Sequence, residues 1–161
     1  MMSIKRFNFL EIKEKAEKLK EIWKKFHVCE SSFGFLAEDV FAPLIGTICD
    51  EQINSEDAWN FPEWLHDKIG KLDLGKLLEV DYEKVLEEYL MNRWPKGMKE
   101  KERKEYIEKT SRAIRGALEF FEKEGKTPIT IFEDRVYQAI EVYFTLRRIS
   151  GIGPKKANMI T

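Results

Sequence analysis

The sequence has few cysteines, no long apolar run and no excess of charge, and each shortage excludes a class of protein. Only Cys29 and Cys49 are present, and no histidine lies at a metal-ligand spacing from them. The chain therefore cannot supply a complete zinc or iron–sulfur site, and we expect no metal and two free thiols. No apolar stretch is long enough to span a bilayer, and the first residues lack the apolar core of a signal peptide, so we expect no membrane association.

The charges nearly balance, which removes any global signal for nucleic-acid binding. Basic residues number 28 and acidic residues 29, for a net charge of −1. A site for an anionic polymer must then come from a local cluster of basic residues. Glutamine is scarce while Lys and Glu are abundant, a bias typical of heat-adapted proteins.

Apolar residues recur with the helical period along almost the whole chain, which predicts an all-α fold. Residues 8–26 carry one apolar stripe, and the segment from Val40 to Ile48 is apolar almost all round, as in a buried central helix. We expect further helices from Ser55 as the cap to Gly70, from Asp81 as the cap to about residue 90, over 99–123 and over 136–148. Pro62 should interrupt the first of these, 71–80 should be a connection, 92–97 a loop, and Gly125 a helix stop.

The most informative segment is the stretch Ile149-Ser150-Gly151-Ile152-Gly153-Pro154-Lys155-Lys156-Ala157, near the end of the chain. Two glycines around an apolar residue predict a tight turn with an exposed backbone, and Pro154 suits the first position of a helix. The turn amides, the helix N-terminus and the two lysines would then attract an anion such as a DNA phosphate, without regard to base sequence. A plain helix–turn–helix connection with solvated lysines is the alternative.

This stretch resembles the hairpin of the helix–hairpin–helix DNA glycosylase superfamily, which includes endonuclease III. Ser150 stands where the family usually has proline. A second resemblance lies upstream, where the segment from Leu44 to Ser55 is similar to the family's buried helix and its glutamine-bearing turn. The resemblance implies a six-helix barrel over residues 35–161. Residues 1–34 would belong to an incomplete second helical domain, completed by a region beyond Thr161, so we expect a C-terminally truncated chain.

The resemblance also implies roles for single residues. Lys155 matches the lysine that attacks the sugar and forms a Schiff base in members with lyase activity, and Gln52 matches the residue that fills the gap left by a flipped base. Gln52 could instead satisfy helix ends, and Lys155 could merely bind phosphate. Gly151, Ile152, Gly153 and Lys156 would contact DNA. The family's catalytic aspartate lies beyond this chain, which should therefore be poorly active. The same missing region leaves room for an iron–sulfur cluster, and this chain itself should hold no cofactor.

The sequence thus predicts a base-excision repair glycosylase with AP lyase activity on damaged bases or abasic sites in duplex DNA. We expect it in the cytoplasm of a bacterium or archaeon, associated with the nucleoid. A non-catalytic helix–hairpin–helix DNA-binding module is the first alternative. A helical interaction protein, in which the glycines serve only a turn, is the second.

Overall fold

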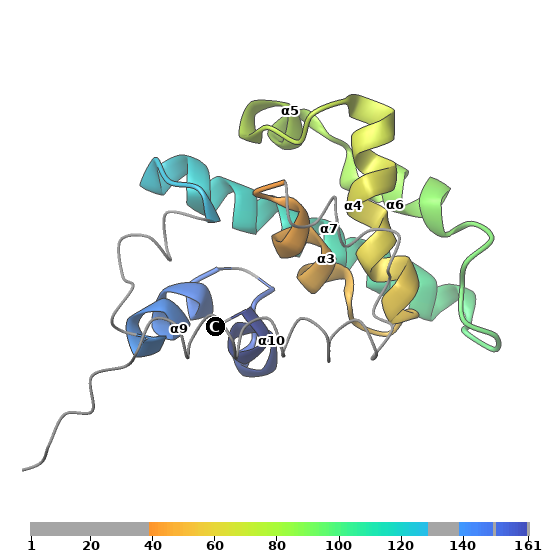
Figure 1. Cartoon of the computed structure of the whole chain (residues 1–161). Coiled ribbons are helices and arrows are strands. Elements are labelled where there is room, and N and C mark those ends of the chain that lie inside the picture. The colour runs from red at the N-terminus through yellow and green to blue at the C-terminus, as the bar shows by residue number, and fades with distance from the viewer. Residues whose placement is uncertain (1–38, 129–138, 150, 161) are drawn as a thin grey trace, which may run out of the picture.

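The structure, a computed structural model, describes residues 39–128, 139–149 and 151–160 (Figure 1). All regular elements within these ranges are helices, as the periodicity predicts. They are α3 (Ala42–Cys49), α4 (Ser55–Ile69), α5 (Leu74–Glu79), α6 (Tyr82–Leu90), α7 (Glu100–Glu124), α9 (Ala139–Arg147) and α10 (Pro154–Ile160). The expected helix over 8–26, the unit assigned to residues 1–34, Cys29 and Ser150 lie outside the described residues.

Helix α3 is the centre of the core, because seven of its eight residues are buried. Ile45 is fully buried, and so are Ala42 and Cys49 at the two ends of the helix. Helix α4 approaches α3 closely at Gly46, where a Cβ atom would lie 2.7 Å from Cε3 of Trp59. An apolar stretch of this kind is stable in water only when other elements surround it, which is what α4 and α7 do (Figure 1).

Helix α7 is the longest element and supports the rest of the fold. Its buried face includes Ile114, Ala117, Leu118 and Phe121, at the spacing of one helical stripe. Gly125 ends the helix in the left-handed conformation, with φ +62°, as the sequence predicts. The cap at Asp81 is also confirmed, because its carboxylate accepts a hydrogen bond from the Lys84 amide at 3.2 Å.

Three expectations about local structure are wrong. Helix α4 runs through Pro62 without a break, since Pro62 itself is buried in the core. Ser55 is the first helical residue and Asn54 the N-cap, and the Ser55 hydroxyl donates to Asp50 instead. The supposed connection over 71–80 contains α5, whose N-cap Asp73 accepts from the Lys76 amide at 3.0 Å.

Helices α9 and α10 form the hairpin, with α10 beginning at Pro154 as expected. Ile152, in the turn between them, is only 3% exposed, and Leu146, Ile149 and Ala157 are buried around it. The Ile152 amide donates to the Ile149 carbonyl at 3.1 Å. The Ile152 carbonyl accepts a bond from Nη1 of Arg147 at 3.4 Å. Ile152 therefore acts as an apolar wedge that joins the hairpin to the core.

Candidate functional site

An open cleft of about 1020 Å³ separates the hairpin from the turn that follows α3, with α7 as a third wall. It brings together segments about 100 residues apart in the sequence. Gln52 and Lys155, the two residues singled out from the sequence, both line it. The lining consists of Thr47, Ile48, Asp50, Glu51, Gln52, Ser55, Lys109, Thr110, Arg112, Ala113, Gly151, Ile152, Gly153, Pro154, Lys155 and Lys156.

The backbone of residues 50–54, here named the Gln52 turn, has an uncommon conformation. Asp50 has φ −73° and ψ 65°, and the Glu51 amide donates to the Cys49 carbonyl at 2.7 Å, which defines an inverse γ-turn. Gln52 follows with φ +66°, and it is the only non-glycine residue with positive φ among those described. This conformation costs about 1–2 kcal/mol for a residue with a Cβ atom, so the surrounding contacts must maintain it.

The Gln52 turn has two carboxylates, and both interact with neighbouring side chains. Asp50 accepts from the Ser55 hydroxyl at 2.9 Å and from Nε1 of Trp59 at 3.2 Å. Glu51 Oε2 lies 3.1 Å from Nζ of Lys109, on α7, and 3.7 Å from Nζ of Lys156. Burial favours the neutral acid at Glu51, but the hydrogen bond from Lys109 and the charges of both lysines outweigh it, so the pKa of Glu51 is lowered.

The Gln52 side chain itself is exposed and forms no hydrogen bond with a described residue. Within the described part of the chain, the Gln52 amide does not satisfy the end of a helix, which was the alternative role for this residue. Other groups satisfy the end of α3: the Tyr106 hydroxyl donates to the Cys49 carbonyl at 2.8 Å, and Lys156 donates to the Ile48 carbonyl. Gln52 is thus presented to the cleft by a turn that other residues stabilise.

The two glycines of the hairpin have different surroundings. Gly151 has φ +80°, and a Cβ atom there would lie 2.4 Å from the Cβ atom of Ala113 on α7. Gly153 has no atom within 4 Å of its would-be Cβ position. The amides of Gly153 and Lys155 donate to no described residue. Gly151 therefore brings the hairpin against α7, while Gly153 leaves a strip of backbone open to the cleft.

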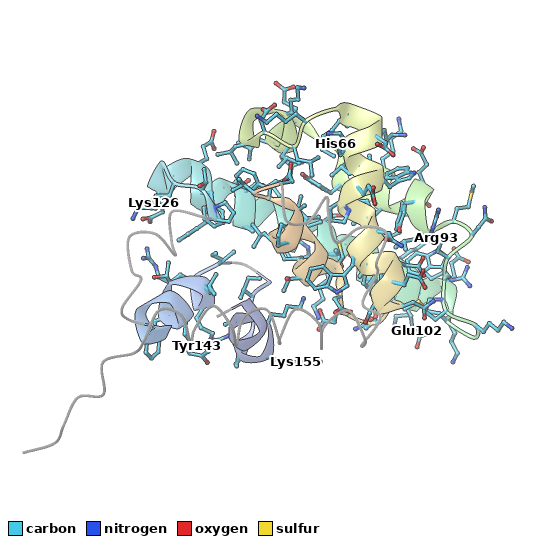
Figure 2. The ribbon with its side chains drawn as sticks, in the orientation of Figure 1. His66, Arg93, Glu102, Lys126, Tyr143 and Lys155 are labelled. Atoms are coloured by element: carbon cyan, nitrogen blue, oxygen red, sulfur yellow. The ribbon has the colours of Figure 1, made fainter. Side chains whose placement is uncertain are left out.

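Of the four basic residues that cluster around the hairpin, three have partners. Arg147 donates to the Ile152 carbonyl, Arg148 pairs with Glu124 at 3.3 Å, and Lys156 is bound to the end of α3. Lys155 alone is exposed without a hydrogen bond or ion pair to any residue that the structure describes. Figure 2 shows it on α10, at the opposite side of the molecule from His66. Its amine is the group most available to a bound molecule.

Lys156 occupies a different environment from that of a solvated phosphate-binding lysine. Its side chain is only 13% exposed, and Nζ donates to the Ile48 carbonyl oxygen at 2.9 Å. Because the partner lies 108 positions earlier in the chain, nothing in the local sequence indicates this bond. The bond can therefore be identified only from the folded structure.

The aromatic residues near the cleft are mostly part of the core. Phe61 is fully buried and stacks with Trp64, at 6.0 Å between ring centroids. Trp59 is half-buried over Gly46 and bonded to Asp50. Trp94, in the 92–97 loop, packs edge-on against Tyr106 at 5.8 Å. None of these five residues is in the lining of the cleft.

A scan against protein-family models, a search of curated proteins and a search of solved structures found no match to this chain. Within the described ranges, no group of three or more His, Cys, Asp or Glu side chains is arranged to hold a metal ion. No helix in those ranges is long and apolar enough to cross a membrane. The fold class that the structure supports is all-α.

Proposed function

We propose that this chain carries the DNA-binding and nucleophilic part of a helix–hairpin–helix DNA glycosylase with AP lyase activity. The cleft would receive duplex DNA at a damaged base or an abasic site. Lys155 would supply the amine, and Gln52 the side chain that occupies the gap in the duplex. The observation that carries the proposal is that one cleft holds Gln52, Lys155 and the open backbone at Gly153.

The electrostatics of the cleft favour an anionic guest. Four basic side chains line it, from Lys109, Arg112, Lys155 and Lys156, against two acidic ones, from Asp50 and Glu51. The chain as a whole has no such excess, so the positive charge is local. A cleft with one dominant sign of charge raises the local concentration of the opposite ion and speeds its association. Phosphate groups along a DNA strand are the matching partner, and such contacts do not depend on base sequence.

The chemistry proposed for Lys155 requires an accessible amine next to the sugar. A neutral amine attacks the anomeric carbon of an abasic site in its open aldehyde form, water leaves, and a protonated imine results. Solvent water then removes a proton from the neighbouring sugar carbon, the electron pair forms a double bond, and the 3′ phosphate leaves, which cuts the strand. Lys155 is suited to this role because no described side chain holds its amine.

One observation favours the second candidate, a non-catalytic DNA-binding module. Both carboxylates of the cleft are occupied, Asp50 by Ser55 and Trp59 and Glu51 by two lysines. Neither is placed as a free base beside Lys155. The module would use the same hairpin and the same cleft for phosphate but would leave the sugar intact.

DNA binding is tested by fluorescence anisotropy with a labelled duplex that carries one stable abasic analogue. We expect affinity to fall steeply between about 50 and 200 mM salt, and Lys155→Met to reduce the slope of log K against log salt by about one. Lys71→Met is the matched control, since Lys71 is exposed and comes shortly before α5 in the sequence, and α5 lies on the opposite side of the molecule from α10 (Figure 1). Affinity that does not change with salt would refute both candidate functions.

The lyase step is tested by strand cleavage of a duplex with a natural abasic site, with protein in excess so that one turnover suffices. We expect slow cleavage by the wild type and none by Lys155→Ala or Lys155→Arg, because a guanidinium is not a nucleophile at neutral pH. Lys71→Ala should cleave as the wild type does. Salt-dependent binding without any wild-type cleavage would select the module, and unchanged cleavage by Lys155→Ala would refute the nucleophile.

A further inference from the structure

The end of α3 is held by residues that come from two distant parts of the chain. Its last two carbonyl groups have no partner within the helix, because the chain turns away at Asp50. Tyr106 of α7 donates to the Cys49 carbonyl, and Lys156 of α10 donates to the Ile48 carbonyl at 2.9 Å. A positively charged group at a helix C-terminus is also favoured by the helix dipole.

Lys156 has a second partner on the same turn. Its Nζ lies 3.7 Å from Oε2 of Glu51, and that oxygen is 3.1 Å from Nζ of Lys109 on α7. The Glu51 carboxylate is thus shared between the hairpin and α7. Glu51 directly precedes Gln52, whose positive φ needs support from outside the turn.

We propose that Lys156 is a positioning residue, whose ammonium holds the Gln52 turn and the hairpin at a fixed separation across the cleft through Ile48 and Glu51. It is not a phosphate ligand in this proposal, because its side chain is only 13% exposed and its ammonium is held by the Ile48 carbonyl and by Glu51. Lys155, its neighbour in sequence, lines the same cleft with an amine that no described residue holds, while Lys156 anchors the helix that carries it. The proposal deepens the proposed function and rests on it for the part that concerns DNA.

The charges around Lys156 support a structural role over one in anion binding. Glu51 is the acidic group that faces it from the turn, Lys109 faces the same carboxylate from α7, and Asp50 lies next in sequence. With only 13% of its side chain exposed, Lys156 would have to move its ammonium away from Ile48 and Glu51 to bind a phosphate fully. Such a rearrangement would leave the Ile48 carbonyl and Glu51 without their partner on the hairpin, which is unfavourable for partly buried groups.

The first test needs no DNA and is hydrogen exchange in the free protein. The Asp50 amide is bonded to the Gly46 carbonyl and the Glu51 amide to the Cys49 carbonyl. We expect both to exchange about tenfold faster in Lys156→Met, while Ile114 in the middle of α7 is unchanged. Lys156→Arg should retain most of the protection, because a guanidinium can donate to both partners. Equal exchange at Asp50 and Glu51 in wild type and Lys156→Met would overturn the proposal.

Glu51→Gln keeps the shape of the side chain and removes only its charge, so it provides a second variant if Lys156→Met does not fold. It should speed exchange at the same two amides by a smaller factor. Exchange equal to that of the wild type at both amides would contradict the link through Glu51.

The second test uses DNA and separates Lys156 from Lys155. Lys156→Met should leave the salt slope of duplex binding equal to that of the wild type, whereas Lys155→Met lowers it by about one. A duplex with 2-aminopurine at the extruded position should show less fluorescence increase with Lys156→Met, as with Gln52→Gly, and Lys156→Arg should recover it. A slope reduced by about one in Lys156→Met would make Lys156 a phosphate ligand. If the wild type binds no DNA, the proposed function fails, and hydrogen exchange still decides the positioning role.

Discussion

Gly151 and Ala113 approach each other so closely that a Cβ atom on Gly151 would lie 2.4 Å from the Cβ atom of Ala113. The contact joins the hairpin to α7, and both residues line the cleft. Gly151 also has φ +80°, a conformation that residues with a Cβ atom rarely adopt. Two independent constraints therefore require glycine at this position.

Gly151→Ala should lower the free energy of unfolding by about 2–4 kcal/mol, the sum of backbone strain and steric overlap. Gly97→Ala separates the two effects, since Gly97 has φ +87° and no atom near its would-be Cβ; it should cost about 1–2 kcal/mol. The double variant Gly151→Ala, Ala113→Gly should recover part of the loss by removing the overlap. Urea unfolding measures all three, and equal losses for Gly97→Ala and Gly151→Ala would contradict the packing argument.

Gly153→Ala should have the opposite profile, with stability retained and DNA affinity reduced. A methyl group at Gly153 meets nothing in the protein, but it would stand between the open backbone and a phosphate. We expect a change in unfolding free energy below about 0.5 kcal/mol, as for surface substitutions, and at least a threefold loss of duplex affinity. Unchanged affinity would show that the guest does not approach the hairpin backbone.

The sequence predicted those features of the fold that depend on local chemistry. The apolar character of α3 indicated burial, Asp81 indicated a cap, Gly125 indicated a helix end and Pro154 a helix start. Each rests on a preference that operates within one turn of the chain. Gln52 and Lys155 line one cleft, and the resemblance and the function that it implies stay predictions.

The features that the sequence could not predict depend on distant partners or on short segments. Helix α5 has six residues, too few to display a period. The sequence predicts that Pro62 interrupts α4. The helix nevertheless continues, because burial of that segment offsets the backbone hydrogen bond that proline cannot donate. The bond from Lys156 to the Ile48 carbonyl joins residues 108 positions apart, so a pair of adjacent lysines in the sequence does not predict it.

Glu51 should make a part of the stability depend on pH. Burial opposes ionisation of the Glu51 carboxyl, but the interactions with Lys109 and Lys156 outweigh it. They lower the pKa of Glu51 in the folded state below the ordinary value of 4.5. A lowered pKa contributes stability above the unfolded value, which is lost as pH falls through the folded value. The difference in unfolding free energy between wild type and Glu51→Gln should be constant above about pH 4.5 and shrink below it. The effect is small because the side chain is 44% exposed, and a difference that grew with falling pH would contradict the ion pairs.

Gly46→Ala tests the contact between α3 and α4 that supports the Gln52 turn. A Cβ atom there would overlap the Trp59 ring, whose Nε1 is bonded to Asp50. We expect a loss of about 1–3 kcal/mol in urea unfolding and a change in tryptophan fluorescence. Gly75→Ala in α5 is the control with the opposite sign, since its nearest atom is 3.5 Å away and alanine favours a helix. Wild-type stability in Gly46→Ala would refute the close approach.

Cys49 should be inert toward thiol reagents in the folded protein. Burial raises the pKa of its thiol to about 12, and the side chain is fully buried at the end of α3. In a Cys29→Ser variant, Cys49 should be labelled only through unfolding. The labelling rate should therefore fall as the denaturant concentration is lowered and the free energy of unfolding rises. Labelling at the rate of a free thiol in the absence of denaturant would show that α3 is not the centre of the core.

The most direct measurement is borohydride reduction of the protein on a duplex with a natural abasic site, followed by peptide mapping of the covalent adduct. Reduction converts the imine into a stable amine bond, so the sugar remains on the lysine that attacked it. We predict an adduct on Lys155 that disappears in Lys155→Arg and persists in Lys71→Arg. An adduct confined to Lys156 or to another lysine, or no adduct from a protein that binds the duplex, would contradict the assignment of Lys155 as the nucleophile.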